Sequence, residues 1–65
     1  MNVLINQSPV DLPEGATVAD AVAHLAPKPP FAVALNLQFI PNTRYAAHPL
    51  AAGDQVEIIA PVTGG

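Results

Sequence analysis

The sequence has no cysteine and only two basic residues, Lys28 and Arg44, against five acidic ones. Without cysteine there is no disulfide framework, no thiol nucleophile and no thiolate metal site. A net charge of -3 with isolated basic residues argues against nucleic acid and anionic membranes, which both bind clusters of Lys and Arg. The longest uncharged stretch, residues 29–43, is shorter than the roughly 20 residues that span a bilayer. We therefore expect a soluble, cytoplasmic protein without a signal peptide.

The chain is also short, at 65 residues, which limits it to one small domain. A domain of this size buries only about 60% of the surface that its unfolded chain exposes, so an enzyme cleft would consume much of the core. The two histidines, His24 and His48, have no third metal ligand at a suitable spacing, and the carboxylates are scattered. We therefore predict a protein that is not an enzyme and that holds no metal or cofactor of its own.

Local patterns divide the chain into short strands around one helix. Aliphatic and β-branched residues over 2–6 and 9–12 predict a hairpin, and Pro9, which has no N–H to donate, places the second strand at a sheet edge. Thr17 is a good N-cap, with Asp20 three residues later as in a capping box, so a helix begins there. The remaining predicted elements are strands over 31–35, 39–40 and 55–60, a helical turn over 42–47 and a tight turn at Gly53 and Asp54.

This order predicts an α+β domain, a mixed sheet of four to five strands with one main helix on one face. The first and last strands are aliphatic enough to be central, and a crossover through the helix lets them run parallel. We assign residues 1–61 to the folded domain and residues 62–65 to a flexible tail. Leu4 and Ile59 then point to the uncovered face of the sheet, where they form a candidate docking surface. The predicted inward residues are Val3, Ile5, Val18, Val22, Leu25, Val33, Leu35, Val56 and Ile58.

The C-terminus combines two glycines, Gly64 and Gly65, shortly after a strand and a proline. Glycine has no side chain to clash and adopts many backbone angles, so a tail that also includes Val62 and Thr63 can thread a narrow channel in a partner. The terminal carboxylate becomes reactive once ATP converts it to an acyl-adenylate, because AMP is a good leaving group for a sulfur or nitrogen nucleophile. Composition alone leaves a functional tail and a fortuitous Gly-Gly end both open.

Several segments carry a resemblance to a known family when they are taken in order. They are residues 3–6 (VLIN), 15–18 (GATV), 33–36 (VALN), 39–41 (FIP) and 50–59 (LAAGDQVEII), the last of which leads into Gly64 and Gly65. With this combination the whole chain resembles the ThiS-type sulfur carriers of thiamine biosynthesis, which belong to the ubiquitin-like β-grasp group. Residues 42–44 depart from the pattern, since such carriers often have a basic residue directly after the proline, and the role of Arg44 stays open.

The resemblance implies a chemistry for the tail and a set of partners. An adenylating enzyme similar to ubiquitin-activating enzymes would use ATP to adenylate the Gly65 carboxylate. Sulfur that a cysteine desulfurase derives from cysteine would replace AMP and give a Gly65 thiocarboxylate, which thiazole synthase would use for the thiazole ring. The chain itself would be a protein co-substrate with no bound cofactor, and its lack of cysteine leaves no side-chain thiol to compete.

Three other functions are compatible with the same residues. The small subunit of molybdopterin synthase also ends in Gly-Gly, and residues 61–62 would suit it, although those subunits are usually longer. A ubiquitin-like modifier would use Gly65 to form an isopeptide bond with lysine. A plain interaction module would use Leu4 and Ile59 and would carry an inert tail.

Overall fold

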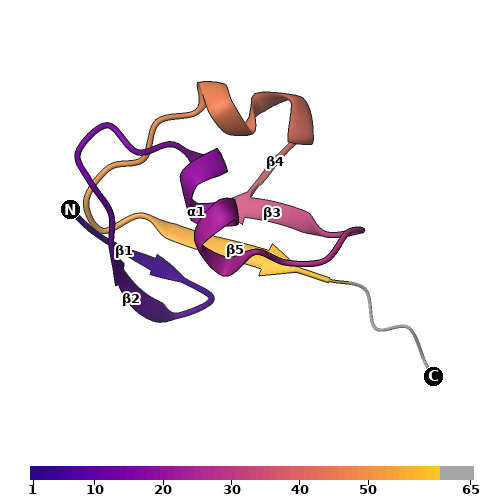
Figure 1. Cartoon of the computed structure of the whole chain (residues 1–65), viewed down its shortest axis with the longest axis horizontal. Helices are drawn as coiled ribbons and strands as arrows, with labels where there is room; N and C mark the ends of the chain where they lie inside the picture. Colours follow the sequence, from indigo (N-terminus) through magenta and orange to yellow (C-terminus); the bar gives the residue numbers. More distant parts are fainter. Residues whose placement is uncertain (61–65) are drawn as a thin grey trace.

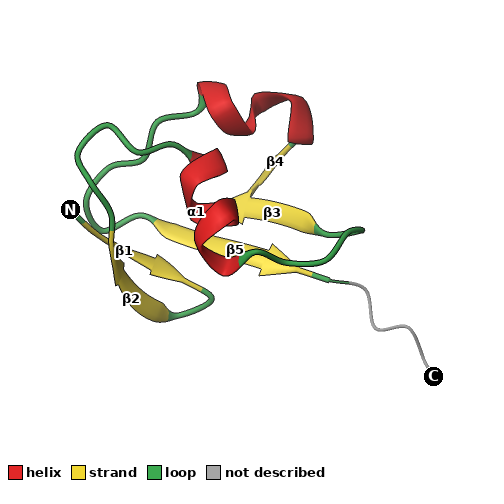
Figure 2. Ribbon diagram, viewed as in Figure 1, coloured by secondary structure: helices red, strands yellow, loops and turns green. Residues whose placement is uncertain are grey.

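The computed structural model of the chain describes residues 1–60, and the predicted tail at 62–65 lies outside them. The described residues form one five-stranded sheet with a helix across one face, which confirms the predicted α+β architecture (Figure 2). The elements are β1 (Asn2–Ile5), β2 (Ser8–Asp11), α1 (Val18–Leu25), β3 (Ala32–Leu35), β4 (Gln38–Ile40), the 3-10 helix η1 (Asn42–Ala47) and β5 (Gln55–Ile59). Neither helical segment in this part of the chain has the length and apolar character that a bilayer span requires.

The sheet has the strand order β2-β1-β5-β3-β4, so the first and last strands lie beside each other. β1 and β5 run parallel, as predicted, while the other three pairings are antiparallel. β2 lies at an edge, where the missing N–H of Pro9 is tolerated best. Because β1 and β5 are parallel, the N-terminus and the end of β5 lie at opposite ends of the sheet (Figure 1).

Apolar side chains on one face of the central strands pack beneath α1. Successive residues of β5 show the division, since Val56 and Ile58 are 1% and 7% exposed while Ile59 is 55% exposed. The division arises because neighbouring residues of a strand point to opposite faces of the sheet. The buried core comprises Val3, Ile5, Leu12, Ala16, Val18, Ala21, Val33, Leu35, Ile40, Leu50, Val56 and Ile58.

The helix packs on the sheet along a narrower stripe than its apolar pattern predicts. Val18 and Ala21 are fully buried, whereas Val22 is half-buried. Leu25 is 42% exposed, so its assignment to the core is wrong. Leu25 is the last residue of α1, and Ala26 after it has a left-handed φ of 52°, so the helix stops where its last side chain lies at the margin of the core. The core residues absent from the sequence-based list are Leu12, Ala16, Ala21, Ile40 and Leu50.

The predicted capping box is present at the start of α1. The Thr17 N–H donates to the Asp20 carboxylate at 2.7 Å, and the Thr17 hydroxyl donates to the same carboxylate at 3.2 Å. The Asp20 N–H donates to the Thr17 carbonyl at 3.0 Å as a bond of the first helical turn. The segment before β5 is bonded to the residue before this N-cap, because the Leu50 N–H donates to the Ala16 carbonyl at 2.9 Å. Local hydrogen bonds and a long-range one therefore fix the start of the helix together.

Both hairpins of the sheet turn through two residues with positive φ, the pattern of a type I′ turn. In the β1–β2 turn, Asn6 and Gln7 have φ of 50° and 69°. In the β3–β4 turn, Asn36 and Leu37 have φ of 49° and 71°. Asparagine tolerates this left-handed region better than most residues with a Cβ do, because its short side chain forms local hydrogen bonds there. The sequence patterns do not reveal the second hairpin, because its turn contains the aliphatic Leu37 where turns usually carry polar residues.

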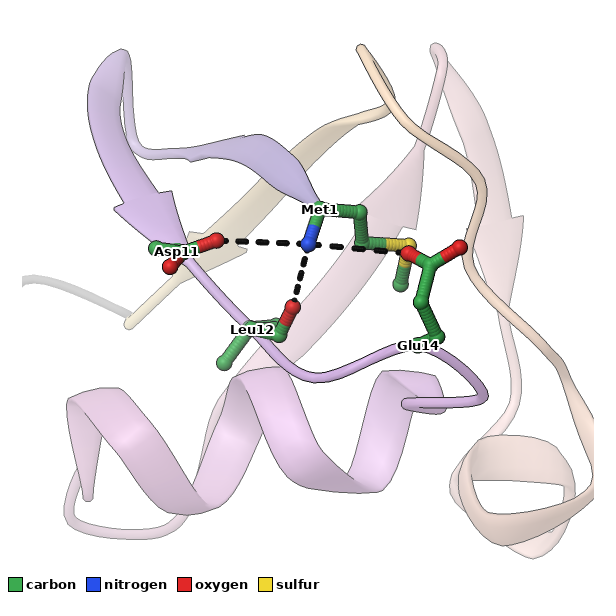
Figure 3. Close-up of polar contacts among 4 residues, drawn as sticks. All are labelled: Met1, Asp11, Leu12 and Glu14. Atoms are coloured by element: carbon green, nitrogen blue, oxygen red, sulfur yellow. Dashed lines mark hydrogen bonds and ion pairs between the residues drawn. The ribbon is translucent and has the colours of Figure 1, made fainter.

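The α-amino group of Met1 ties β1 to the loop that leads into α1 (Figure 3). It donates to the Leu12 carbonyl at 2.6 Å and lies 3.2 Å from the Asp11 carboxylate and 3.6 Å from the Glu14 carboxylate. The Leu12 N–H donates in return to the Met1 carbonyl at 2.8 Å, so backbone pairing continues beyond the ends of β1 and β2. The side chains of Asp11 and Glu14 are 87% and 86% exposed, which leaves their charges well hydrated.

The variants Ile58→Val and Ile59→Val test the two faces of β5 with the same chemical change. Ile58→Val is expected to lower the free energy of unfolding by about 1 kcal/mol, because it removes a buried methylene. Ile59→Val is expected to lower it by less than about 0.5 kcal/mol, because its side chain is largely in water. Urea denaturation measures both values. Equal losses in the two variants would contradict the face assignment.

The double variant Asp11→Asn with Glu14→Gln tests what the ion pairs at the N-terminus contribute. We expect the free energy of unfolding to fall by less than about 1 kcal/mol, because exposed ion pairs contribute little and the Leu12 carbonyl still accepts from the α-amino group. Urea denaturation at low and high salt measures the change, and the difference from the unaltered chain should shrink as salt screens the charges. A large loss that is insensitive to salt would show that the carboxylates act in another way.

Candidate functional site

The predicted reactive end, Gly64 and Gly65 with Val62 and Thr63 before them, lies outside the described residues. The structure describes the chain up to Ala60, the residue that follows β5. β5 has a hydrogen-bonded neighbour on each side, β1 and β3, so the described chain leads toward the tail from the interior of the sheet. The candidate site is therefore the end of β5 together with the surface around it.

The end of β5 is bonded on one side by a side chain. β1 stops at Ile5, and the Asn6 N–H still donates to the Val56 carbonyl at 2.9 Å. Farther along β5, the Ile58 N–H donates to Oδ1 of Asn6 at 2.8 Å, and Nδ2 of Asn6 donates to the Ile58 carbonyl at 3.2 Å. On the other side, Ile58 lies opposite Val33 of β3. Both sides of the strand are therefore held as far as Ile58.

The start of β5 is bonded by the equivalent residue of the other hairpin. The Gln55 N–H donates to Oδ1 of Asn36 at 2.9 Å, and the Asn36 N–H donates to the Gln55 carbonyl at 2.8 Å. Nδ2 of Asn36 also donates to the Asp54 carboxylate at 3.1 Å, within the turn that precedes the strand. That turn includes Gly53, whose φ of +86° is one that residues with a Cβ rarely adopt. The two turn asparagines thus hold the two ends of β5.

The face of the sheet opposite α1 carries the exposed apolar side chains of the strands. Ile59 is 55% exposed and Leu4 is half-buried, and both alternate with core residues, as predicted. Phe39 of β4 is 69% exposed and alternates in the same way with the buried Ile40. It lies opposite Ala34, which in turn lies opposite Glu57 of β5, so these residues form one row across the face.

Leu4 and Ile59 share this face without adjoining each other. Leu4 pairs with Gln55, four residues before Ile59 on β5, which places the two side chains about 13 Å apart along the sheet. The half-buried Ala32 pairs directly with Ile59. Ala32 and Ala34 of β3 have small side chains and lie between Ile59 of β5 and Phe39 of β4. We call Ala32, Ala34, Phe39 and Ile59 the open-face patch.

Of the four residues of the open-face patch the sequence analysis named only Ile59, and Phe39 has the largest side chain among those it missed. The alternation in Gln38–Ile40 is too short to indicate which side chain points inward. Recognition of Asn36 and Leu37 as a two-residue turn would have paired β4 with β3 and would have placed Phe39 on the same face as Ala34.

Other polar groups in residues 1–60 do not assemble into a second site. No three His, Asp or Glu side chains of this segment lie close enough to hold a metal ion, and no pocket opens among these residues. Lys28 and Arg44 are exposed and make no ion pair with a described residue. His48 is half-buried beside η1, with Nδ1 3.2 Å from the Pro49 carbonyl.

Comparisons with known proteins agree with this geometry. The model of the ThiS family matches residues 2–65. Among solved structures, the thiamine biosynthesis protein ThiS from Geobacter metallireducens matches with a TM-score of 0.80 at 25% sequence identity, and the match covers 100% of both chains. A search of curated proteins finds no match. Both matches extend over the sheet, the helix and the segment that follows β5.

Proposed function

The chain belongs to the ThiS family, with a ubiquitin-like β-grasp fold, and we propose that it is a sulfur carrier of thiamine biosynthesis that acts through the carboxylate of Gly65. The observation that carries the proposal is the family match, which includes Gly64 and Gly65 as well as the fold. In this role the chain is a co-substrate, and its partner enzymes supply the catalysis.

The proposed first step activates the terminal carboxylate. An oxygen of the Gly65 carboxylate attacks the α-phosphorus of ATP, which the adenylating enzyme binds, and pyrophosphate leaves. The product is an acyl-adenylate whose acyl carbon accepts a nucleophile, since AMP departs readily. Gly64 and Gly65 suit a channel that ends at bound ATP, because they present no side chain to its walls, and Val62 and Thr63 follow them into it.

The proposed second step replaces oxygen by sulfur. A cysteine desulfurase generates a persulfide from cysteine, and the terminal sulfur of the persulfide attacks the acyl-adenylate and releases AMP. A thiol of the sulfur-supplying partner then attacks the donor's own sulfur in the resulting acyl disulfide. This releases the Gly65 thiocarboxylate and joins the thiol and the donor in a new disulfide. Because the carrier has no cysteine, none of its own side chains competes as a thiol.

The proposed last step delivers the sulfur to thiazole synthase. The Gly65 thiocarboxylate enters that enzyme, and its sulfur forms a bond to a carbon of the thiazole precursor. An oxygen nucleophile of that precursor or of water then breaks the acyl carbon–sulfur bond and restores the Gly65 carboxylate. The carrier is then ready for another cycle. A small domain with no pocket among its described residues suits this task, because every reacting group other than the tail belongs to a partner.

We further propose that the adenylating enzyme holds the carrier by the uncovered face of the sheet. Leu4 and Ile59 are the contacts inferred from the sequence, and the position of Phe39 in the open-face patch adds an aromatic side chain of the kind that dominates protein interfaces. Ile59 precedes Gly65 by six residues, which span at most about 20 Å when extended. Binding of this face by the adenylating enzyme therefore limits the positions that the Gly65 carboxylate can reach.

The length of the tail tests the carrier mechanism. Deletion of Gly65, or addition of one residue after it, is expected to abolish sulfur transfer and to leave the fold intact, because the reacting carboxylate is displaced from ATP while the core is unchanged. The measurement is the intact mass of each chain after incubation with the adenylating enzyme, ATP and a sulfur source, with circular dichroism as the control for folding. The unaltered chain should exchange one oxygen for sulfur.

Other outcomes of the same measurement identify other functions. A ladder of high-mass products would indicate a protein modifier, and an unchanged mass would contradict both a carrier and a modifier. A chain without Gly65 that still supports thiazole formation would show that the tail mechanism is wrong. The same exchange in a chain that assembles with a large subunit into molybdopterin synthase would instead assign it as the small subunit of that enzyme.

The variant Ile59→Glu tests the docking face, and Leu25→Glu is its matched control. Both replace a partly exposed aliphatic side chain by the same carboxylate, on opposite sides of the sheet. We expect Ile59→Glu to weaken binding to the adenylating enzyme about tenfold or more, because it places a charge in a desolvated contact, and Leu25→Glu to change it less than about twofold. Isothermal titration calorimetry measures both dissociation constants. Unchanged affinity in Ile59→Glu would remove this face from the docking proposal.

A further inference from the structure

We propose that Asn6 is a positioning residue for the tail. Its side-chain amide continues the pairing of β5 after the backbone of β1 has turned away, and so holds the β1 side of the strand end that leads to the tail. This inference rests on the proposed function, because the position of that strand end matters for chemistry once a partner reacts with Gly65. The geometry of the amide stands independently of that function.

The hydrogen bonds of Asn6 replace the next rung of a parallel ladder. In a parallel pair of strands, every second residue of one strand uses its N–H and its C=O to bond two different residues of the other strand. In β1 and the residue after it, the N–H groups of Leu4 and Asn6 donate in this way to the Asp54 and Val56 carbonyls. The regular next partner of the Ile58 N–H would be the backbone carbonyl of Asn6. With φ of 50°, Asn6 begins the hairpin turn, and its Oδ1 accepts from the Ile58 N–H at 2.8 Å.

The other half of the amide completes the rung. Its Nδ2 donates to the Ile58 carbonyl at 3.2 Å, which a backbone N–H of β1 would do if the strand continued. Asparagine meets both requirements of this position, since it tolerates a left-handed φ and carries a donor beside an acceptor. Aspartate offers only acceptors when ionised, and glycine keeps the turn but offers neither group.

Loss of this amide would leave the end of β5 bonded on one side only, because β3 still pairs with Ile58 and Ile59. On the β1 side, the last bond to β5 would then be the one at Val56, two residues before Ile58. With one neighbour in place of two, the end of β5 would move more freely, and the carboxylate would sample a larger volume around the fold. A partner would have to order those residues when it binds, which raises the concentration of carrier needed for half-maximal reaction.

Asn36 offers a matched control within the same chain. It occupies the same position of the same type of turn and bonds the backbone of β5, but at Gln55, the end of the strand away from the tail. Asn36→Gly therefore removes a similar pair of side-chain hydrogen bonds and keeps the positive φ. Any effect on reactivity that comes from reduced stability alone should appear in both variants.

The experiment compares the unaltered chain, Asn6→Gly, Asn6→Asp and Asn36→Gly under conditions in which all are folded. The first measurement is the exchange rate of the Ile58 amide hydrogen by NMR. The second is ATP–pyrophosphate exchange by the adenylating enzyme as a function of carrier concentration, which yields KM and kcat. For Asn6→Gly we expect faster Ile58 exchange and a KM raised about three- to tenfold with kcat within twofold. Asn6→Asp should lie between, and Asn36→Gly should keep both Ile58 exchange and KM close to the unaltered values.

Each contrary result has a distinct meaning. Unchanged exchange of the Ile58 amide in Asn6→Gly would overturn the structural role of Asn6. Faster exchange with an unchanged KM, or equal rises of KM in Asn6→Gly and Asn36→Gly, would overturn its role in positioning. Absence of pyrophosphate exchange with the unaltered chain would instead overturn the proposed function, and the positioning role of Asn6 would then have no reaction to serve.

Discussion

The pairing of β5 between β1 and β3 is the interaction on which the other features of this structure depend, because it places the last strand inside the sheet. Val56 and Ile58 then become core residues, and the strand has no free edge along its bonded length. The parallel direction of β1 and β5 puts the N-terminus and the end of β5 at opposite ends of the sheet (Figure 1). The end of β5 is therefore held from both sides and lies far from the loop that Met1 secures.

One face of the sheet stabilises the fold, and the opposite face is the one proposed to bind a partner. One face packs against α1 and supplies most of a core of twelve small and aliphatic residues, which is all that a chain of this length maintains. The opposite face presents Phe39 and Ile59 to solvent and is the proposed surface for the adenylating enzyme. The proposed role of a protein co-substrate requires such a surface for the partner enzymes.

The features that the sequence predicted well are those whose partners are near in the chain. Thr17 and Asp20 are three residues apart, so the capping box followed from their spacing. The opposite faces of Ile58 and Ile59 followed from the alternation of a strand. Leu25 was assigned wrongly because helical periodicity gives the direction of a side chain but not how far the helix extends over the sheet. Leu50 was missed because it reaches the core from an irregular segment that has no period.

The sequence by itself determined most of the local elements and the family, because each depends on residue types at short spacing or on their order along the chain. Only the tertiary structure decided that Asn6 bonds Ile58, a residue 52 positions away, and that Phe39 shares a face with Ile59. Such contacts depend on the order and register of strands in the sheet. That register results from the packing of all the strands and α1 together, and no short segment specifies it.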